Sequence, residues 1–141
     1  MKTILVAYDD TEPSRRALDR AATLAEAFGS RVLVTSIAPL HYSTPRLTLT
    51  VKERGEGLAA REEDMRQAQA LLEERGIAAD ALVARGDPAS AIARLADEHD
   101  VDLVVVGTRE LGALQRLLGQ SVSQAVSRRV RCDLLIVHPG E

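Results

Sequence analysis

The sequence predicts an α/β protein with a five-stranded, mostly parallel sheet and helices on both faces of that sheet. Short apolar runs alternate with longer amphipathic stretches along the chain of 141 residues, as in repeated strand–helix–strand units. Several apolar runs show no polar alternation, which is typical of parallel strands covered on both sides. The length suits a single domain, which we expect to span residues 1–141.

A polar turn separates the first expected strand from the first expected helix. Apolar residues fill Thr3–Tyr8, and two aspartates, Asp9 and Asp10, follow. Thr11 can cap a helix that has a proline in its first turn. Apolar residues then recur at helical spacing up to Gly29, a residue type that commonly ends a helix.

The middle of the chain is expected to contain two strands and one helix. The strands are expected at Val32–Ile37 and Ala79–Ala84. Between them, residues 38–56 contain two prolines and a glycine and form the least regular segment. A helix is expected from about Gly57 to Arg75 because apolar residues recur there at helical spacing.

The last third of the chain continues the alternation. Asp87 followed by a proline is a strong helix start, and this helix is expected to end near His99. Leu103–Val106 and Leu134–Val137 are expected to be strands, with a helix over about 121–130 between them.

Composition excludes several classes of function. The net charge of −3 and the presence of only three aromatic residues argue against a nucleic-acid-binding protein. No apolar stretch reaches the roughly 20 residues of a membrane-spanning helix. Cys132 is the only cysteine, so an internal disulfide is ruled out and we expect a cytoplasmic protein.

Asp9 and Asp10 lie where parallel α/β sheets often bind ligands, at the carboxyl end of a strand. They could bind a divalent metal or contact a ribose hydroxyl, or they could simply cap neighbouring backbone groups. A phosphoacceptor receiver domain would need a further aspartate after the third strand and a lysine after the fifth. Arg85 and His138 stand near those places instead, so the receiver interpretation fails.

The segment 107–120 is much longer than the roughly 2–6 residues that usually connect a strand to a helix. It begins at Gly107 and leads to Ser121, where a helix is expected to open. A glycine after a strand and a hydroxyl at a helix start could form a phosphate-binding cradle. Ser121 could equally be an ordinary helix cap, and leucines within the segment could pack over the sheet.

Other polar residues suggest structural roles. Asp87 is explained as a helix cap, and Cys132 as a small residue of the core. The three histidines (His41, His99, His138) are isolated from one another and do not have metal-ligand spacing. Because no nucleophile or catalytic carboxylate pair emerges either, we expect no enzymatic activity, no catalytic residues and no metal site.

With these motifs in place, the whole chain resembles the universal stress protein family. Residues 4–9 with 11–14 are similar to the family's opening strand and turn, and Gly86–Ile92 to the start of its third helix. Residues 102–109, 121–126 and 131–137 are similar to its fourth strand, fourth helix and last strand. The resemblance implies a Rossmann-like fold of the adenine-nucleotide α-hydrolase type.

ATP-binding members of that family carry Gly-x-x-Gly, nine further residues and then Gly-Ser or Gly-Thr. Gly107 and Ser121 match the first glycine and the final hydroxyl. Glu110 and Gln120 replace the other two glycines. A carboxylate close to phosphate oxygens would oppose binding, which Arg109 and Arg116 would partly offset.

The resemblance therefore implies a degenerate site that binds ATP with Mg²⁺ weakly or not at all. The contacts it implies are Asp9, Ile37, Gly107, Thr108, Arg109, Gly119 and Ser121. Gly119 is included because a loop shifted by one residue would replace the glycine lost at position 120.

The expected function is that of a non-catalytic stress-response protein that presents a surface to protein partners. The alternative is a switch in which ATP at residues 107–121 controls partner binding. A slow ATPase or adenylate-transferring activity ranks third.

Family members commonly form homodimers by pairing their last strands, and the resemblance implies the same here through Leu134–Val137. An apolar strand at the edge of a sheet favours such pairing, because a partner strand would cover its unpaired backbone groups. The alternative is an edge that the chain's own termini cover.

Overall fold

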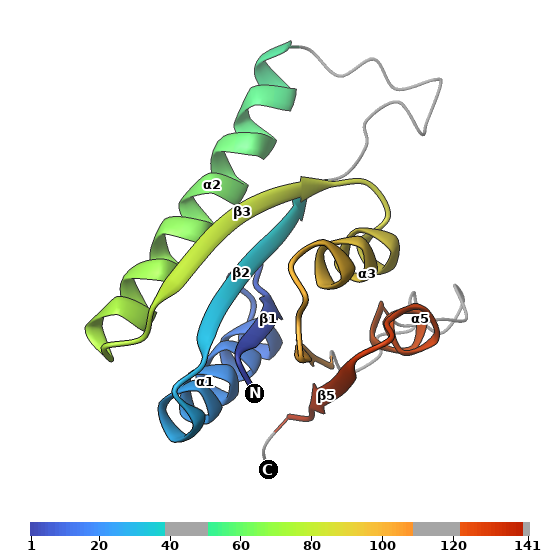
Figure 1. Ribbon diagram of the computed structural model, residues 1–141. Coiled ribbons are helices and arrows are strands. Elements are labelled where there is room, and N and C mark those ends of the chain that lie inside the picture. Colours follow the sequence, from blue (N-terminus) through green and yellow to red (C-terminus); the bar gives the residue numbers. More distant parts are fainter. Residues whose placement is uncertain (39–50, 109–121, 140–141) are drawn as a thin grey trace.

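Figure 1 shows the computed structural model of the chain, which describes residues 1–38, 51–108 and 122–139. Five strands form one sheet in the order β3-β2-β1-β4-β5, and each of its four strand pairings is parallel. The strands are β1 Thr3–Ala7, β2 Arg31–Ala38, β3 Ala79–Arg85, β4 Leu103–Gly107 and β5 Asp133–Val137. The predicted α/β class and five-stranded sheet are confirmed.

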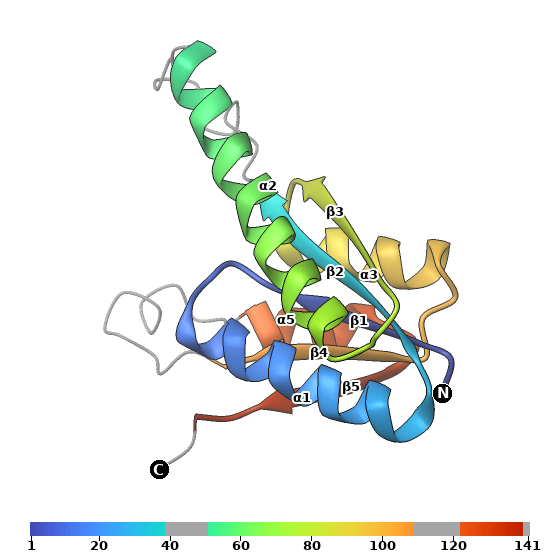
Figure 2. The ribbon, with the colours of Figure 1, turned by 90° about the vertical axis from the view of Figure 1, so that its left-hand side faces the viewer.

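Helices cover both faces of this sheet, as predicted (Figures 1 and 2). Helices α1 and α2 lie on one face, and α3 and α5 lie on the other. The helices are α1 Glu12–Phe28, α2 Val51–Glu74, α3 Pro88–Glu98 and α5 Val122–Arg129. The result is a three-layer arrangement with the sheet in the middle.

Two aliphatic cores, one on each face, explain why the strands carry uninterrupted apolar runs. In β1, Ile4 and Val6 belong to the core under α1 and α2, whereas Leu5 belongs to the core under α3. All three side chains are fully buried. Tyr8 is the one aromatic residue in either core among the residues that the structure describes. Both layers are therefore held mainly by aliphatic burial.

Helix α2 is longer than the sequence pattern predicted. It begins at Val51 rather than near Gly57, so residues 51–56 are helical and the prediction of an irregular segment is wrong for them. Glycine costs a helix only about 1 kcal/mol relative to alanine, and the lysine, glutamates and arginine around Gly55 favour helix. Figure 2 shows that the first turns of α2 extend beyond the ends of β2 and β3.

The first turn of α1 lies against the end of β4. A Cβ atom added at Gly107 would come within 2.2 Å of the Pro13 carbonyl oxygen and 2.6 Å of its carbonyl carbon. Both contacts are with backbone, which cannot be relieved by rotating a side chain. Glycine at position 107 is thus required by the packing of α1 on β4, before any ligand is considered.

We predict that Gly107→Ala lowers the free energy of unfolding by about 1–3 kcal/mol, because α1 must move away from β4. Urea denaturation followed by circular dichroism measures this loss. Gly29→Asn is the control, since Gly29 has a left-handed φ of 66° and open space where a side chain would lie. Asparagine tolerates that conformation, so this variant should lose less. Equal stability of Gly107→Ala and the native protein would contradict the packing role.

Candidate functional site

The candidate site lies at the carboxyl ends of the parallel strands. Asp9 follows β1, Ile37 lies near the end of β2, and Gly107 ends β4. Strand order reverses between β1 and β4, because the chain moves outward to β2 and β3 before it returns to β4. Open α/β sheets bind ligands at such a reversal. The structure therefore brings these three predicted residues to one edge of the sheet, on neighbouring strands.

A compact hydrogen-bond network fixes the turn from β1 into α1. The Ser14 hydroxyl accepts hydrogen bonds from the backbone amides of Asp9 (3.2 Å) and Thr11 (3.1 Å), and donates one to the Thr11 carbonyl (2.9 Å). The Asp9 carboxylate accepts hydrogen bonds from the Thr11 amide (3.2 Å) and from the Thr11 hydroxyl. The Asp9 side chain is thus held in one orientation and remains partly exposed.

Asp10 faces a different set of partners. It adopts a left-handed backbone conformation with a φ of 59°, which an aspartate tolerates. Its carboxylate accepts a hydrogen bond from the Tyr8 hydroxyl (3.1 Å) and pairs with the Arg15 guanidinium (3.1 Å). Burial raises the pKa of Tyr8, and Asp10 raises it further. Asp10 therefore joins α1 to β1, which fits the structural interpretation of this residue.

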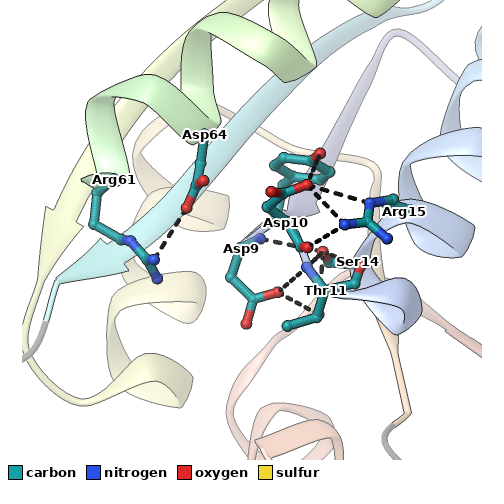
Figure 3. A network of polar contacts seen from close by, with 8 residues as sticks. Asp9, Asp10, Thr11, Ser14, Arg15, Arg61 and Asp64 are labelled. Carbon is teal, nitrogen blue, oxygen red and sulfur yellow. Dashed lines mark hydrogen bonds and ion pairs between the residues drawn. The ribbon is translucent and has the colours of Figure 1, made fainter. Parts of the chain in front are cut away.

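Helix α2 contributes a second pair of charges that the sequence patterns did not identify. Figure 3 shows Arg61 and Asp64 extending from α2 toward the turn that carries Asp9 and Asp10. The two side chains form an ion pair with 3.2 Å between Nη2 of Arg61 and Oδ2 of Asp64. The sequence did contain a signal, since position 64 lies four residues before the inward-facing Ala68 and therefore on the same face of α2.

Asp64 is an unusually buried carboxylate. It is only 7% exposed, and its Oδ2 atom accepts no hydrogen bond despite the nearby guanidinium. Burial raises the pKa of Asp64, Arg61 counteracts this shift, and the charges of Asp10 and Asp9 add to it. The charges of Asp9 and Asp10, in the turn before α1, therefore repel the carboxylate of Asp64 on α2.

The described start of the long segment after β4 is already engaged in packing and pairing. Gly107 contacts Pro13, as described above. The Thr108 amide donates a hydrogen bond to the Val137 carbonyl (3.0 Å), which extends the ladder between β4 and β5. The Thr108 hydroxyl donates a second, longer hydrogen bond (3.5 Å) to the same carbonyl. The Thr108 amide is thus unavailable for a phosphate group.

The remaining predicted contacts, Arg109, Gly119 and Ser121, lie outside the described residues, as do Glu110 and Gln120. The predicted packing of the leucines in this segment lies outside them too. Ile37 is half-buried and packs against the core under α3. Its side chain offers an apolar surface beside the strand ends.

The structural interpretation of Asp87 is confirmed. Its carboxylate accepts hydrogen bonds from the Ser90 amide (3.0 Å) and hydroxyl (2.8 Å), and it pairs with Arg129 of α5 at 3.2 Å. The Ser90 amide is the largest cause of the lowered pKa of Asp87. Asp87 thus caps α3 and links it to α5.

Among the described residues, no cluster of three or more histidine, cysteine, aspartate or glutamate side chains could hold a metal ion. None of the described helices is long and apolar enough to cross a membrane. Cys132 is half-buried against the core under α3, and burial raises the pKa of its thiol. These properties suit the predicted packing role.

We predict that Asp64→Asn raises the thermal stability at neutral pH, because burial penalises the carboxylate more than Arg61 favours it. The folded state holds the Asp64 proton more tightly than the unfolded state, so the native protein gains stability as pH falls toward the ordinary value of 3.8. The difference between variant and native protein should therefore shrink on acidification. Melting temperatures measured by circular dichroism across this range test it. A less stable variant at neutral pH would show that the ion pair outweighs burial.

Comparison with known proteins agrees with this architecture. The family model described as the universal stress protein family matches residues 1–138. A universal stress protein of Thermus aquaticus is 37% identical over 96% of this chain and 98% of its own length. The universal stress protein Rv1636 of Mycobacterium tuberculosis is 35% identical, with coverage of 97% and 96%.

A solved structure supports the same relationship. This chain is similar to a universal stress protein in complex with cAMP, with a TM-score of 0.77 and 30% sequence identity. The similarity covers 99% of this chain and 98% of that one. The resemblance expected from the strand ends and helix starts is thus confirmed by sequence and by structure, and the chain belongs to the universal stress protein family.

Proposed function

We propose that this protein is a cytoplasmic, non-catalytic universal stress protein that binds an adenine nucleotide carrying a single phosphate. ATP with Mg²⁺ binds weakly or not at all in this proposal. The observation that carries it is the fixed Asp9 carboxylate at the reversal of strand order, beside the ends of β2 and β4. An acidic side chain in this place is a frequent acceptor for ribose hydroxyls.

The surfaces on the two sides of Asp9 differ in chemistry, and this difference indicates the orientation in which a nucleotide would bind. On the β2 side, Ile37 offers apolar surface suited to a purine base. On the β4 side lies Gly107, and the next described element, α5, begins at Val122. A helix start of this kind attracts anions. The base end of the nucleotide is therefore assigned to β2, the ribose to Asp9 and the phosphate end to β4.

The phosphate end favours a small anion. The Thr108 amide already donates its hydrogen bond to Val137, and the Pro13 backbone occupies the space that a side chain at Gly107 would fill. Glu110 and Gln120 replace two glycines of the family's triphosphate loop, which adds a like charge and two Cβ atoms. The relative of known structure that is 30% identical was solved with cAMP, a nucleotide with one phosphate.

A role in binding fits the geometry of Asp9. Its carboxylate accepts two hydrogen bonds from Thr11, which fix its orientation toward a ribose hydroxyl. Any Mg²⁺ would arrive with the phosphates of ATP.

Isothermal titration of nucleotide-free protein with AMP, cAMP and ATP–Mg²⁺ tests the proposal. We expect AMP or cAMP to bind at least about tenfold more tightly than ATP, which corresponds to about 1.4 kcal/mol. Asp9→Ala should weaken that binding by about 10- to 100-fold, the value of a hydrogen bond to a charged group. Asp80→Ala, at the opposite end of the sheet, should change little.

Two outcomes would contradict this picture. ATP binding as tight as that of AMP and cAMP would show that the altered loop still holds a triphosphate. An unchanged affinity in Asp9→Ala would remove the ribose assignment. The double variant Glu110→Gly/Gln120→Gly should gain affinity for ATP, because it restores both glycines.

We also propose that the protein is a homodimer formed through β5. This strand lies at the edge of the sheet and pairs with β4 alone. Leu134, Leu135 and Ile136 are each only half-buried, although all three are apolar. A second copy of β5 would cover them and pair with the exposed backbone.

Sedimentation equilibrium at micromolar concentration is expected to give twice the chain mass of 15.2 kDa. The Val137 carbonyl faces β4, so the backbone groups of its neighbour Ile136 point to the open edge. Ile136→Pro removes this outward donor and should reduce the dimer fraction, because proline disfavours strand pairing. The matched control is a proline at position 133, the first residue of the strand, where proline is better tolerated. A native protein that sediments at the chain mass would contradict the proposal.

A further inference from the structure

Arg61 lies at the base end of the proposed nucleotide site, although it comes from α2 and matches none of the predicted contacts. The first turns of α2 extend past the carboxyl ends of β2 and β3 (Figure 2). In Figure 3 the Arg61 side chain extends from α2 toward the level of Asp9. Arg61 is therefore on the β2 side of Asp9.

The Arg61 guanidinium is oriented but largely uncommitted. Within the described part of the chain its one polar partner is Asp64, through a single contact of 3.2 Å. Its side chain is 29% exposed, whereas that of Asp64 is 10% exposed. Asp64 is thus the more buried member of the pair, and the Arg61 side chain remains partly exposed, with further N–H donors beyond the one that pairs with Asp64. The Arg15 guanidinium, in contrast, donates hydrogen bonds to both the carboxylate and the backbone carbonyl oxygen of Asp10.

Stacking on a flat group strengthens the binding of a purine base, and the described residues place no exposed phenylalanine or tyrosine ring at this end of the sheet. Tyr8 is 3% exposed, and it lies in the core under α1 and α2. Phe28 ends α1, at the opposite end of that helix from the Asp9 turn. Tyr42 lies outside the described residues. A guanidinium can take this role, because its planar cation stacks favourably on aromatic faces.

From these observations we infer that Arg61 is a base-contacting residue that stacks on the adenine ring, with Asp64 as the positioning residue that holds it. Ile37, which packs against the core under α3, supplies apolar surface near the end of β2. The inference rests on the proposed nucleotide function and adds a contact from α2 to it. The ligand part that Arg61 recognises is the purine, so adenosine should depend on Arg61 as strongly as AMP does.

The test compares adenosine, AMP and ribose 5-phosphate by isothermal titration. Arg61→Ala should weaken adenosine and AMP by the same factor, about 3- to 30-fold for a partly desolvated stacking cation. Arg61→Lys keeps the charge but not the plane, and should recover only part of this loss. Ribose 5-phosphate binding should not change. The matched control is Arg66→Ala, because Arg66 is an exposed arginine of the same helix that pairs with Glu63.

Removal of Arg61 alone leaves a buried carboxylate without its ion pair and could destabilise the fold. Asp64→Asn and the double variant Arg61→Ala/Asp64→Asn are therefore measured together, because asparagine removes that charge. The double variant should show the full loss of adenosine affinity relative to Asp64→Asn, and its urea midpoint should equal that of Asp64→Asn. Asp64→Asn alone should weaken adenosine by less, since Arg61 is present but less firmly held.

Three results would overturn the assignment. Loss of AMP and ribose 5-phosphate binding with adenosine unaffected would place Arg61 at the phosphate. Unchanged affinity for every ligand in the double variant would leave Arg61 outside the site. Native protein that binds neither adenosine nor AMP would refute the proposed function itself, and the assignment of Arg61 with it.

Discussion

The close approach of α1 to β4 is the constraint on which the rest of the site depends. Because Gly107 has no side chain, the backbone of Pro13 can lie directly against it. That contact sets where α1 begins, and Ser14 and Thr11 in its first turn then fix the Asp9 carboxylate. A glycine that family comparison alone would assign to phosphate binding thus also aligns the helix that orients the neighbouring acid.

Charge is balanced around this turn by residues from two helices. Arg15 of α1 pairs with Asp10, and Arg61 of α2 pairs with Asp64. Of these four residues, Asp64 nevertheless lowers the stability of the folded state, since its carboxylate is buried and is repelled by the charges of Asp9 and Asp10. A buried ion pair of this kind is weak evidence for stability, and a ligand-positioning role gives it a clearer purpose.

Much of the fold could be predicted from the sequence, because strands buried on both faces and capped helix starts leave strong local patterns. The Asp87 cap and the parallel sheet are examples. The start of α2 is not evident from the sequence, because the two prolines and the glycine of residues 38–56 are typical of an irregular segment. Arg61 and Asp64 were missed because their function depends on how α2 packs over β2. No local spacing relates positions in α2 to Asp9, so only the three-dimensional arrangement identifies them.

The hydrogen bond from Thr108 to Val137 has a mechanical consequence for the proposed assembly. It ties the first residue beyond β4 to the last residue of β5, the strand at the open edge of the sheet. A shift in β5 is therefore transmitted through a backbone hydrogen bond to the segment that begins the phosphate end. Subunit pairing and ligand occupancy would then be thermodynamically linked, so that each changes the equilibrium constant of the other by the same factor.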